Sequence, residues 1–163
     1  MAEGRLKAYL AAAAVFGLDR LTKLIIERWV PESVSYRVIP GFFDIVHSEN
    51  RGVAFGIFND STFEWRNLAL IAVAVAAVIF ISIYLWRARQ VDTAMLWGMA
   101  LILGGAAGNA IDRIVSGRVT DFLEFYIGEY HWPTFNMADS ALVIGSGLLL
   151  LDMLRSKQAA NVS

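Results

Sequence analysis

Three stretches of the chain carry almost no charged side chains over the length of a membrane-spanning helix. The clearest runs over 67–86, a second covers 93–111, and a third, over 135–151, is interrupted only by Asp139. A helix rises about 1.5 Å per residue, so about 20 apolar residues cross the roughly 30 Å of hydrocarbon in a bilayer. Only 18% of the residues are charged, against about 25% in a typical soluble domain. The sequence therefore predicts an integral membrane protein.

A fourth apolar segment, over 8–26, contains Asp19, Arg20 and Lys23. Three charges at a bilayer centre cost roughly 8–10 kcal/mol, and the large apolar residues of the segment return about 4. The segment can therefore span only if these groups lie near one interface and face protein or water. A cleaved signal peptide is the alternative, but no small-x-small site precedes a polar start, and apolar residues resume after Lys23.

Basic residues in the short connections predict the orientation. They fall before the first helix, between the second and third helices, and after the fourth: Arg5, Lys7, Arg87, Arg89, Arg155 and Lys157. All three places lie on one side of a four-helix path, so the positive-inside rule places both termini in the cytoplasm. The longer connections, about 27–66 and 113–134, are then expected outside.

The outer connections contain further structure. Residues 34–39 and 42–47 are rich in β-branched and aromatic residues with a Pro-Gly turn between them, and 52–58 is a candidate third strand. Residues 121–130 are interpreted as a short interfacial helix. The expected fold is an all-α membrane protein, a four-transmembrane-helix bundle with a small extracytoplasmic β-sheet and a short interfacial helix. We expect one integral membrane domain over 1–163, with helices at about 8–26, 67–86, 93–113 and 136–154, and an outer β-region at about 33–58.

Several polar residues in the predicted helices need partners. Asp19 and Lys23, four positions apart, share a helix face as a structural pair or as a pair that shapes a site. Asn109, Asp112 and Arg113 project from one side of the third helix. An anion is unfavourable near a helix C-terminus, so Asp112 needs a cation, which Arg113, Arg20 or Lys23 could supply. In the same helix, Gly104 and Gly108 predict close helix packing.

Asp121 and Asp139 each have an ordinary structural explanation. Asp121 could cap the interfacial helix, and Asn136 and Asp139 have the spacing of a capping box. The predicted topology nevertheless places both aspartates at the same outer boundary. Two carboxylates that meet in a partly dehydrated site share a proton, so that one activates water while the other donates to a carbonyl oxygen. This is the pattern of an aspartic protease.

Other chemistries fit the sequence less well. There is no cysteine, only two histidines, and no serine hydrolase, zincin, Walker A or Rossmann motif. A net charge of -1 gives no reason to expect nucleic acid as a partner. We expect no cofactor and no metal, with an Asp/Asn-bound metal as the less favoured alternative.

Five blocks of sequence, in order, resemble the signature blocks of the lipoprotein signal peptidases, also called type II signal peptidases. They are Asp19-Arg20-Leu21-Thr22-Lys23, Asn50-Arg51-Gly52-Val53-Ala54-Phe55, the segment 104–113 (GGAAGNAIDR), Val119-Thr120-Asp121-Phe122 and Phe135-Asn136-Met137-Ala138-Asp139-Ser140. The blocks span nearly the whole chain. One departure is Arg20, which stands where glutamine is usual, and this leaves the local partner of Asp112 open.

The resemblance implies a membrane aspartic endopeptidase of the bacterial inner membrane, with its active site near the outer face. It would remove signal peptides from diacylglyceryl-modified prolipoproteins, cutting before the lipidated cysteine, and globomycin-type inhibitors would block it. Asp121 and Asp139 match the catalytic aspartates. The residues that match substrate-binding or supporting positions are Asn50, Gly52, Asn109, Asp112, Arg113, Asn136, Asp19 and Lys23.

Two other classes of protein remain open from the residues alone. A small membrane transporter or channel could use the intramembrane charges as a polar path, although these charges crowd the outer end. A scaffold subunit would use the same polar groups only to pack its helices.

Overall fold

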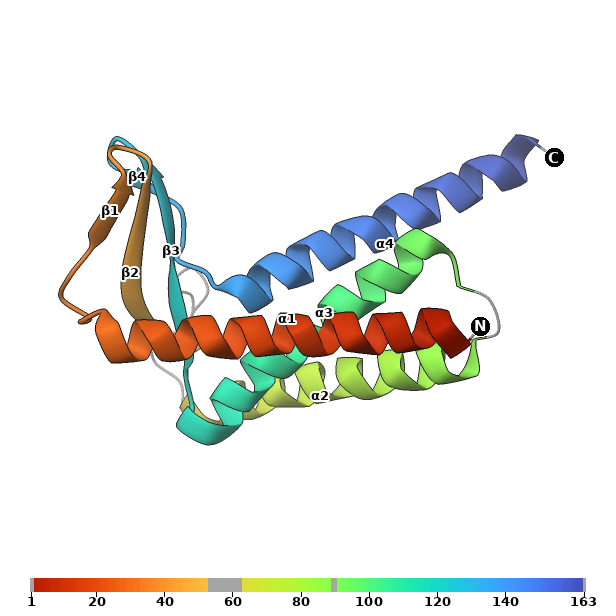
Figure 1. The fold of residues 1–163 in the computed structure, drawn as a ribbon, viewed down its shortest axis with the longest axis horizontal. Coiled ribbons are helices and arrows are strands. Elements are labelled where there is room, and N and C mark those ends of the chain that lie inside the picture. The colour runs from red at the N-terminus through yellow and green to blue at the C-terminus, as the bar shows by residue number, and fades with distance from the viewer. Residues whose placement is uncertain (1, 53–62, 89–90, 163) are drawn as a thin grey trace.

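The computed structural model describes residues 2–52, 63–88 and 91–162. Its elements, in chain order, are α1 Ala2–Trp29, β1 Tyr36–Ile39, β2 Phe43–Asn50, α2 Phe63–Arg87, α3 Thr93–Ser116, β3 Val119–Ile127, β4 Tyr130–His131 and α4 Met137–Val162. Figure 1 shows the long helices α1 to α4, with the strands gathered at one end and both chain termini at the other. A hydrogen bond from Arg5 to the carbonyl of Ala88 joins the start of α1 to the end of α2.

Among the described residues, three helices are long and apolar enough to cross a membrane: Trp65–Arg87, Thr93–Ser116 and Met137–Arg155. α1 has sufficient length but carries charges. Of these, Asp19 and Lys23 are fully buried inside the protein, whereas Leu18, Leu21 and Leu24 on its outer face are about half exposed. This is the arrangement that a bilayer requires of a charged helix.

α3 lies at the centre of the helices and packs against α1, α2 and α4. Its glycines make these contacts close. A Cβ on Gly104 would lie 2.5 Å from the Ala12 carbonyl oxygen of α1, and one on Gly105 would lie 2.6 Å from the Ala138 carbonyl oxygen of α4. The close packing predicted from Gly104 and Gly108 is therefore present, and it is directed at α1.

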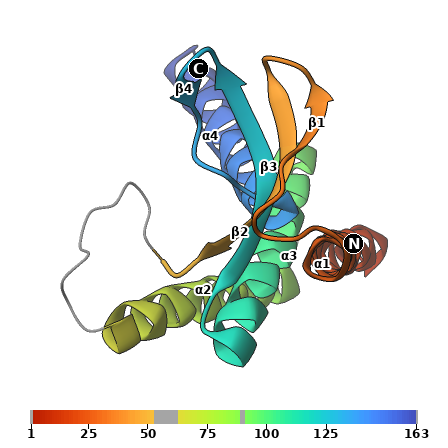
Figure 2. The same ribbon diagram turned by 90° about the vertical axis from the view of Figure 1, so that its left-hand side faces the viewer.

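The strands form one small antiparallel sheet in the order β1-β2-β3-β4. Figure 2 views this end of the molecule, where β3 rises from the end of α3. The turn between them depends on Gly117, whose φ of 71° lies in the left-handed region that favours glycine. The chain therefore reverses within two residues and brings the first half of β3 back over the end of the bundle.

The predicted interfacial helix at 121–130 is wrong, because this segment forms most of β3 together with β4. A helix would place Phe125 and Tyr126 on neighbouring parts of one face. In the strand they point to opposite faces: Phe125 stacks on Phe43 and Phe135, whereas the Tyr126 hydroxyl bonds to Asp44. Pairing with β2 decides the conformation of a short segment rich in aromatic residues.

The two strands predicted in the first outer connection are present as β1 and β2, and Gly41, with φ of 77°, lies in the turn between them. The third strand predicted at 52–58 falls mainly on residues 53–62, which lie outside the described residues.

Candidate active site

Asp121 and Asp139 reach the same place from two different elements. Asp121 is the third residue of β3, and Asp139 lies in the first turn of α4. The loop between these elements is tied to β3, where the backbone N–H groups of Phe122 and Leu123 both donate to the carbonyl of Phe135. This pairing places the start of α4 beside the part of β3 that carries Asp121.

Asn136 connects the two carboxylates. Its side-chain Nδ2 donates to Asp121 Oδ1 at 2.6 Å, and its backbone N–H donates to Asp139 Oδ2 at 3.3 Å. Asn136 is fully buried, so these bonds are shielded from water. The aspartates, remote in sequence, are thus joined through a single residue.

The capping box predicted from Asn136 and Asp139 is formed. The Asp139 backbone N–H donates to Asn136 Oδ1 at 2.9 Å, and the Asp139 carboxylate accepts the Asn136 N–H in return. The second Asp139 oxygen, Oδ1, accepts a hydrogen bond from Asn109 Nδ2 at 2.7 Å. The cap fixes the rotamer of Asp139 and turns its carboxylate toward Asp121 and Asn109, so the structural explanation and the dyad are compatible.

Asp121 is 1% exposed and is held by amides rather than by cations. Asn50 Nδ2 donates to its Oδ2 at 2.9 Å, opposite the bond from Asn136. Burial raises the pKa of Asp121 from 3.8 to about 6, and the charge of Asp139 adds to this rise. The two amide bonds and the charge of Lys23 act in the opposite direction and only partly offset burial.

The orientation of Asn50 depends on Gly52. The backbone N–H of Gly52 donates to Asn50 Oδ1 at 2.8 Å, which leaves Asn50 Nδ2 to face Asp121. Gly52 has φ of 89°, a conformation that residues with a side chain rarely adopt. Gly52 therefore orients Asn50 through its backbone, and no contact of Gly52 with Asp121 is needed.

Next to the dyad lies a cluster of buried charges. Lys23 Nζ lies 2.8 Å from Asp19 Oδ2, 2.6 Å from Asp112 Oδ2 and 3.0 Å from Asn109 Oδ1. The contacts with Asp19 and Asn109 are hydrogen bonds, and the contact with Asp112 is an ion pair. The other Asp19 oxygen accepts the N–H of Ala138 at 2.9 Å, which anchors α1 to the start of α4.

Of the three cations that the sequence offered as partners of Asp112, two form ion pairs with it. Arg20 pairs with its Oδ1 and Lys23 with its Oδ2. The third, Arg113, instead donates to the backbone carbonyl of Asn109 at 3.1 Å, and its charge lies within electrostatic reach of Asp139 and Asp121. Arg20 is thus the outer partner of Asp112.

A bulge in β2 decides which side chains face the dyad. Ile45 lies opposite Leu123, and Ser48 lies opposite Asp121. Between these two pairs β2 advances by three residues while β3 advances by two, so β2 contains one extra residue. Side chains alternate along a strand, so one extra residue reverses the face of everything after it. Asn50 therefore shares the face of Asp121. Without the bulge, the acidic Glu49 would occupy that face.

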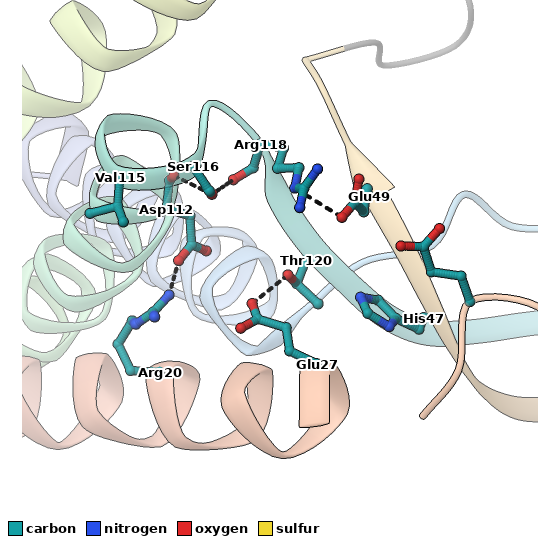
Figure 3. A pocket seen from close by; sticks show the side chains of 10 residues that line it. Arg20, Glu27, His47, Glu49, Asp112, Val115, Ser116, Arg118 and Thr120 are labelled. Atoms are coloured by element: carbon teal, nitrogen blue, oxygen red, sulfur yellow. Dashed lines mark hydrogen bonds and ion pairs between the residues drawn. The ribbon is translucent and has the colours of Figure 1, made fainter. Parts of the chain in front are cut away.

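The opposite face of the two strands borders a polar cavity of about 330 Å³, shown in Figure 3. Sequence reasoning missed this cavity and its contacts. Thr120 donates to Glu27 of α1 at 2.7 Å, and Arg118 lies 2.9 Å from Glu49. The Thr120 bond ties α1 to the residue that precedes Asp121, but no sequence spacing links residues that are so remote.

Within the described residues, Glu32, His47 and Glu49 bring possible metal-binding atoms within 4.8 Å of one another at this cavity. Glu49 already pairs with Arg118, and His47 Nδ1 bonds to the Val30 carbonyl at 2.8 Å. These contacts do not involve the aspartate dyad. That the protein needs no metal or cofactor stays a prediction.

Comparison with known proteins identifies the family. Residues 11–155 match the family model described as signal peptidase (SPase) II. The chain belongs to the signal peptidase II family. A lipoprotein signal peptidase from Solibacter usitatus is 62% identical over the full length of both chains. One from Oleidesulfovibrio alaskensis is 44% identical and covers 91% of this chain and 95% of its own. A solved bacterial membrane enzyme, 31% identical, has a TM-score of 0.81 and covers 93% of this chain and 89% of its own.

Membership of the signal peptidase II family makes the chain a peptidase and therefore a hydrolase of the aspartic type that the family contains. The apolar helices and the membrane-enzyme neighbour make it a membrane protein. The transporter alternative finds no support in the buried charges, because Asp19, Lys23, Asp112 and Arg20 pair with one another at the sheet end.

Proposed function

We propose that this peptidase removes the signal peptide from diacylglyceryl-modified prolipoproteins, cutting before the lipidated cysteine with Asp121 and Asp139 as the catalytic pair. The observation that carries the proposal is the bridge through Asn136, which bonds to both carboxylates within a buried site. Two carboxylates joined in this way, with amides as their direct partners, can hold one proton between them.

The surroundings of the two aspartates support different roles for them. The raised pKa of Asp121 favours its protonated form, which donates to the oxygen of the scissile carbonyl. Asp139 lies at the N-terminus of α4, where the helix dipole favours an anion, and Asn109 donates to it. Asp139 therefore takes the proton from the attacking water.

The reaction balances with these two groups. The water oxygen forms a bond to the carbonyl carbon, one water proton passes to Asp139, and the proton of Asp121 passes to the carbonyl oxygen. The tetrahedral intermediate then collapses. Its C–N bond breaks, the leaving amine takes a proton from Asp139, and Asp121 regains its proton from a hydroxyl group of the collapsing intermediate. Asn50 and Asn136 bond to Asp121, and the charge of Arg113 acts on both aspartates. In this proposal these three residues bind the extended peptide or the developing oxyanion.

We further propose that all four long helices span the bacterial inner membrane as one domain over 1–163, with both termini in the cytoplasm. Support comes from the burial of Asp19 and Lys23, which leaves α1 an apolar outer face. The basic ends of the helices lie with the termini, opposite the sheet (Figure 1). The dyad then lies near the outer face, at the depth of the cleavage site of a lipid-anchored substrate.

In this arrangement the partners are membrane lipids and a lipidated prolipoprotein, whose acyl chains stay in the bilayer while the peptide enters between helices. Globomycin-type cyclic peptides would occupy the same site. Nucleic acid has no role in this proposal. The position of the dyad at the junction of the sheet and the helices supports lateral entry of the substrate.

The test replaces each aspartate with asparagine and measures cleavage of a lipidated prolipoprotein by purified, folded enzyme. Asp121→Asn and Asp139→Asn should each lower kcat by at least about 1000-fold, or about 4 kcal/mol. Asp44→Asn is the matched control, because Asp44 is also a buried aspartate of the sheet but bonds to Ser35 and Tyr126. Near-normal cleavage by either dyad variant, with proper insertion, would rule out the assignment.

A further inference from the structure

Arg20 is the outermost member of the buried charge cluster. Its side chain is 28% exposed, whereas that of Asp112 is 4% exposed and those of Lys23 and Asp19 are fully buried. Figure 3 shows Arg20 extending from α1 to Asp112 at the edge of the polar cavity. Arg20 therefore contacts both water and the cluster.

The charge of Arg20 balances the cluster. Asp19 and Asp112 bring two negative charges and Lys23 brings one positive charge. Arg20 supplies the second positive charge through its ion pair with Asp112. A buried carboxylate that loses a partner is costly, because desolvation is no longer offset by attraction.

Lys23 donates hydrogen bonds to Asp19 and Asn109 and forms an ion pair with Asp112. Without Arg20, Asp112 would be left with one cationic partner, and Lys23 would be drawn toward it and away from Asn109. The bond from Lys23, at 3.0 Å, and a longer bond from Asn136 Nδ2, at 3.3 Å, both reach Asn109 Oδ1 and set the direction of the Asn109 amide. Since Lys23 donates to Asn109 Oδ1, the Nδ2 group faces Asp139 and donates to it at 2.7 Å.

We propose that Arg20 is a positioning residue for Asp139: by holding Asp112 it leaves Lys23 free to orient Asn109, which holds the Asp139 carboxylate. The inference rests on the proposed function of Asp139. Among the described residues, Arg20 pairs with Asp112 and with neither dyad carboxylate, so it acts only through this series of bonds.

The experiment measures kcat and KM for a lipidated prolipoprotein, per folded molecule, in Arg20→Met. Removal of the ion pair should lower kcat about tenfold and leave KM within about twofold, because the substrate contacts are unchanged. Arg20→Lys, which keeps a cation, should recover most of the lost kcat. Arg118→Met is the matched control: it removes an arginine–carboxylate pair from the same cavity, with Glu49, and should leave kcat within about twofold.

A double variant distinguishes a loss of positioning from a loss of folding in Arg20→Met. Adding Asp112→Asn to Arg20→Met removes the negative charge that Arg20 no longer balances, so the double variant should be more stable and more active than Arg20→Met alone. Any one of four results would overturn the inference. Arg20→Met could keep the wild-type kcat or change only KM, Arg118→Met could lose as much kcat as Arg20→Met, or the double variant could show no recovery. Asp139→Asn is assayed in parallel, because its activity would instead overturn the proposed function.

Discussion

Two pairs of aspartates lie next to each other at the sheet end of the helices, and they differ in what holds them. Asp19, Asp112 and Asp121 are buried, and Asp139 is partly buried. Asp19 and Asp112 are bound by cations, Lys23 between them and Arg20 outside. Asp121 and Asp139 are bound directly by the amides of Asn50, Asn109 and Asn136. Asn109 belongs to both groups, since it accepts from Lys23 and donates to Asp139.

This difference explains how carboxylates so close together can serve different purposes. A cation in direct contact offsets part of the cost of burying a carboxylate and makes it a structural element. An amide orients a carboxylate without supplying a full charge, so its proton can still be exchanged during a reaction. The cation-bound pair therefore supports the fold, and the amide-bound pair is available for chemistry.

The largest effect on stability should follow from removing the cation of the structural pair. Lys23→Met leaves two buried carboxylates with only Arg20 to balance them, and we expect it to cost about 3–5 kcal/mol of the free energy of unfolding. Chemical unfolding in detergent micelles measures this cost. Adding Asp112→Asn should restore part of it; a stable Lys23→Met protein would mean that the cation does not define the structural pair.

The amide-bound pair should instead make stability depend on pH. Asp121 binds its proton more tightly in the fold than in the unfolded chain, because its pKa rises from 3.8 to about 6. The stabilisation is therefore complete below pH 3.8 and is lost as the pH rises through about 6. It amounts to at most about 3 kcal/mol. Unfolding measured from pH 4 to 7 should show this slope in the wild type and lack it in Asp121→Asn, and equal slopes in both proteins would contradict the assignment.

A smaller effect is expected from the packing that supports the structural pair. A Cβ on Gly108 would lie 2.5 Å from Asp19 Oδ2, so Gly108→Ala must displace that carboxylate or part the helices. We expect a loss of about 1–3 kcal/mol in stability. Gly147→Ala is the control, because nothing lies within 4 Å of its added Cβ. Equal thermal unfolding of the two variants would show that the contact between α3 and α1 is not tight.

Some of the contacts that distinguish the two aspartate pairs could be predicted from the sequence, and others could not. Spacing alone indicated that Asp19 pairs with Lys23, and charge-free stretches indicated three apolar helices. The capping-box spacing located Asp139 at the start of α4. These features are local, because the partners lie within one helix turn and their geometry follows from the helical repeat.

The features that sequence reasoning missed depend on pairing between remote segments. The bulge before Ser48 selects Asn50 rather than Glu49 for the face of Asp121, and no residue pattern marks its position. The strand conformation of Phe125 and Tyr126 depends on β2 and β4 beside them. In so short a segment, pairing with neighbouring strands outweighs the local tendency to form a helix.

The pH dependence of kcat/KM for a lipidated prolipoprotein tests the central claim most directly. If Asp121 and Asp139 hold one proton between them, the profile should be bell-shaped, with activity falling above about pH 6 as Asp121 loses its proton and falling again in acid as the second carboxylate gains one. A profile with a single ionisation, or a flat one between pH 4 and 8, would contradict proton sharing and with it the proposed mechanism.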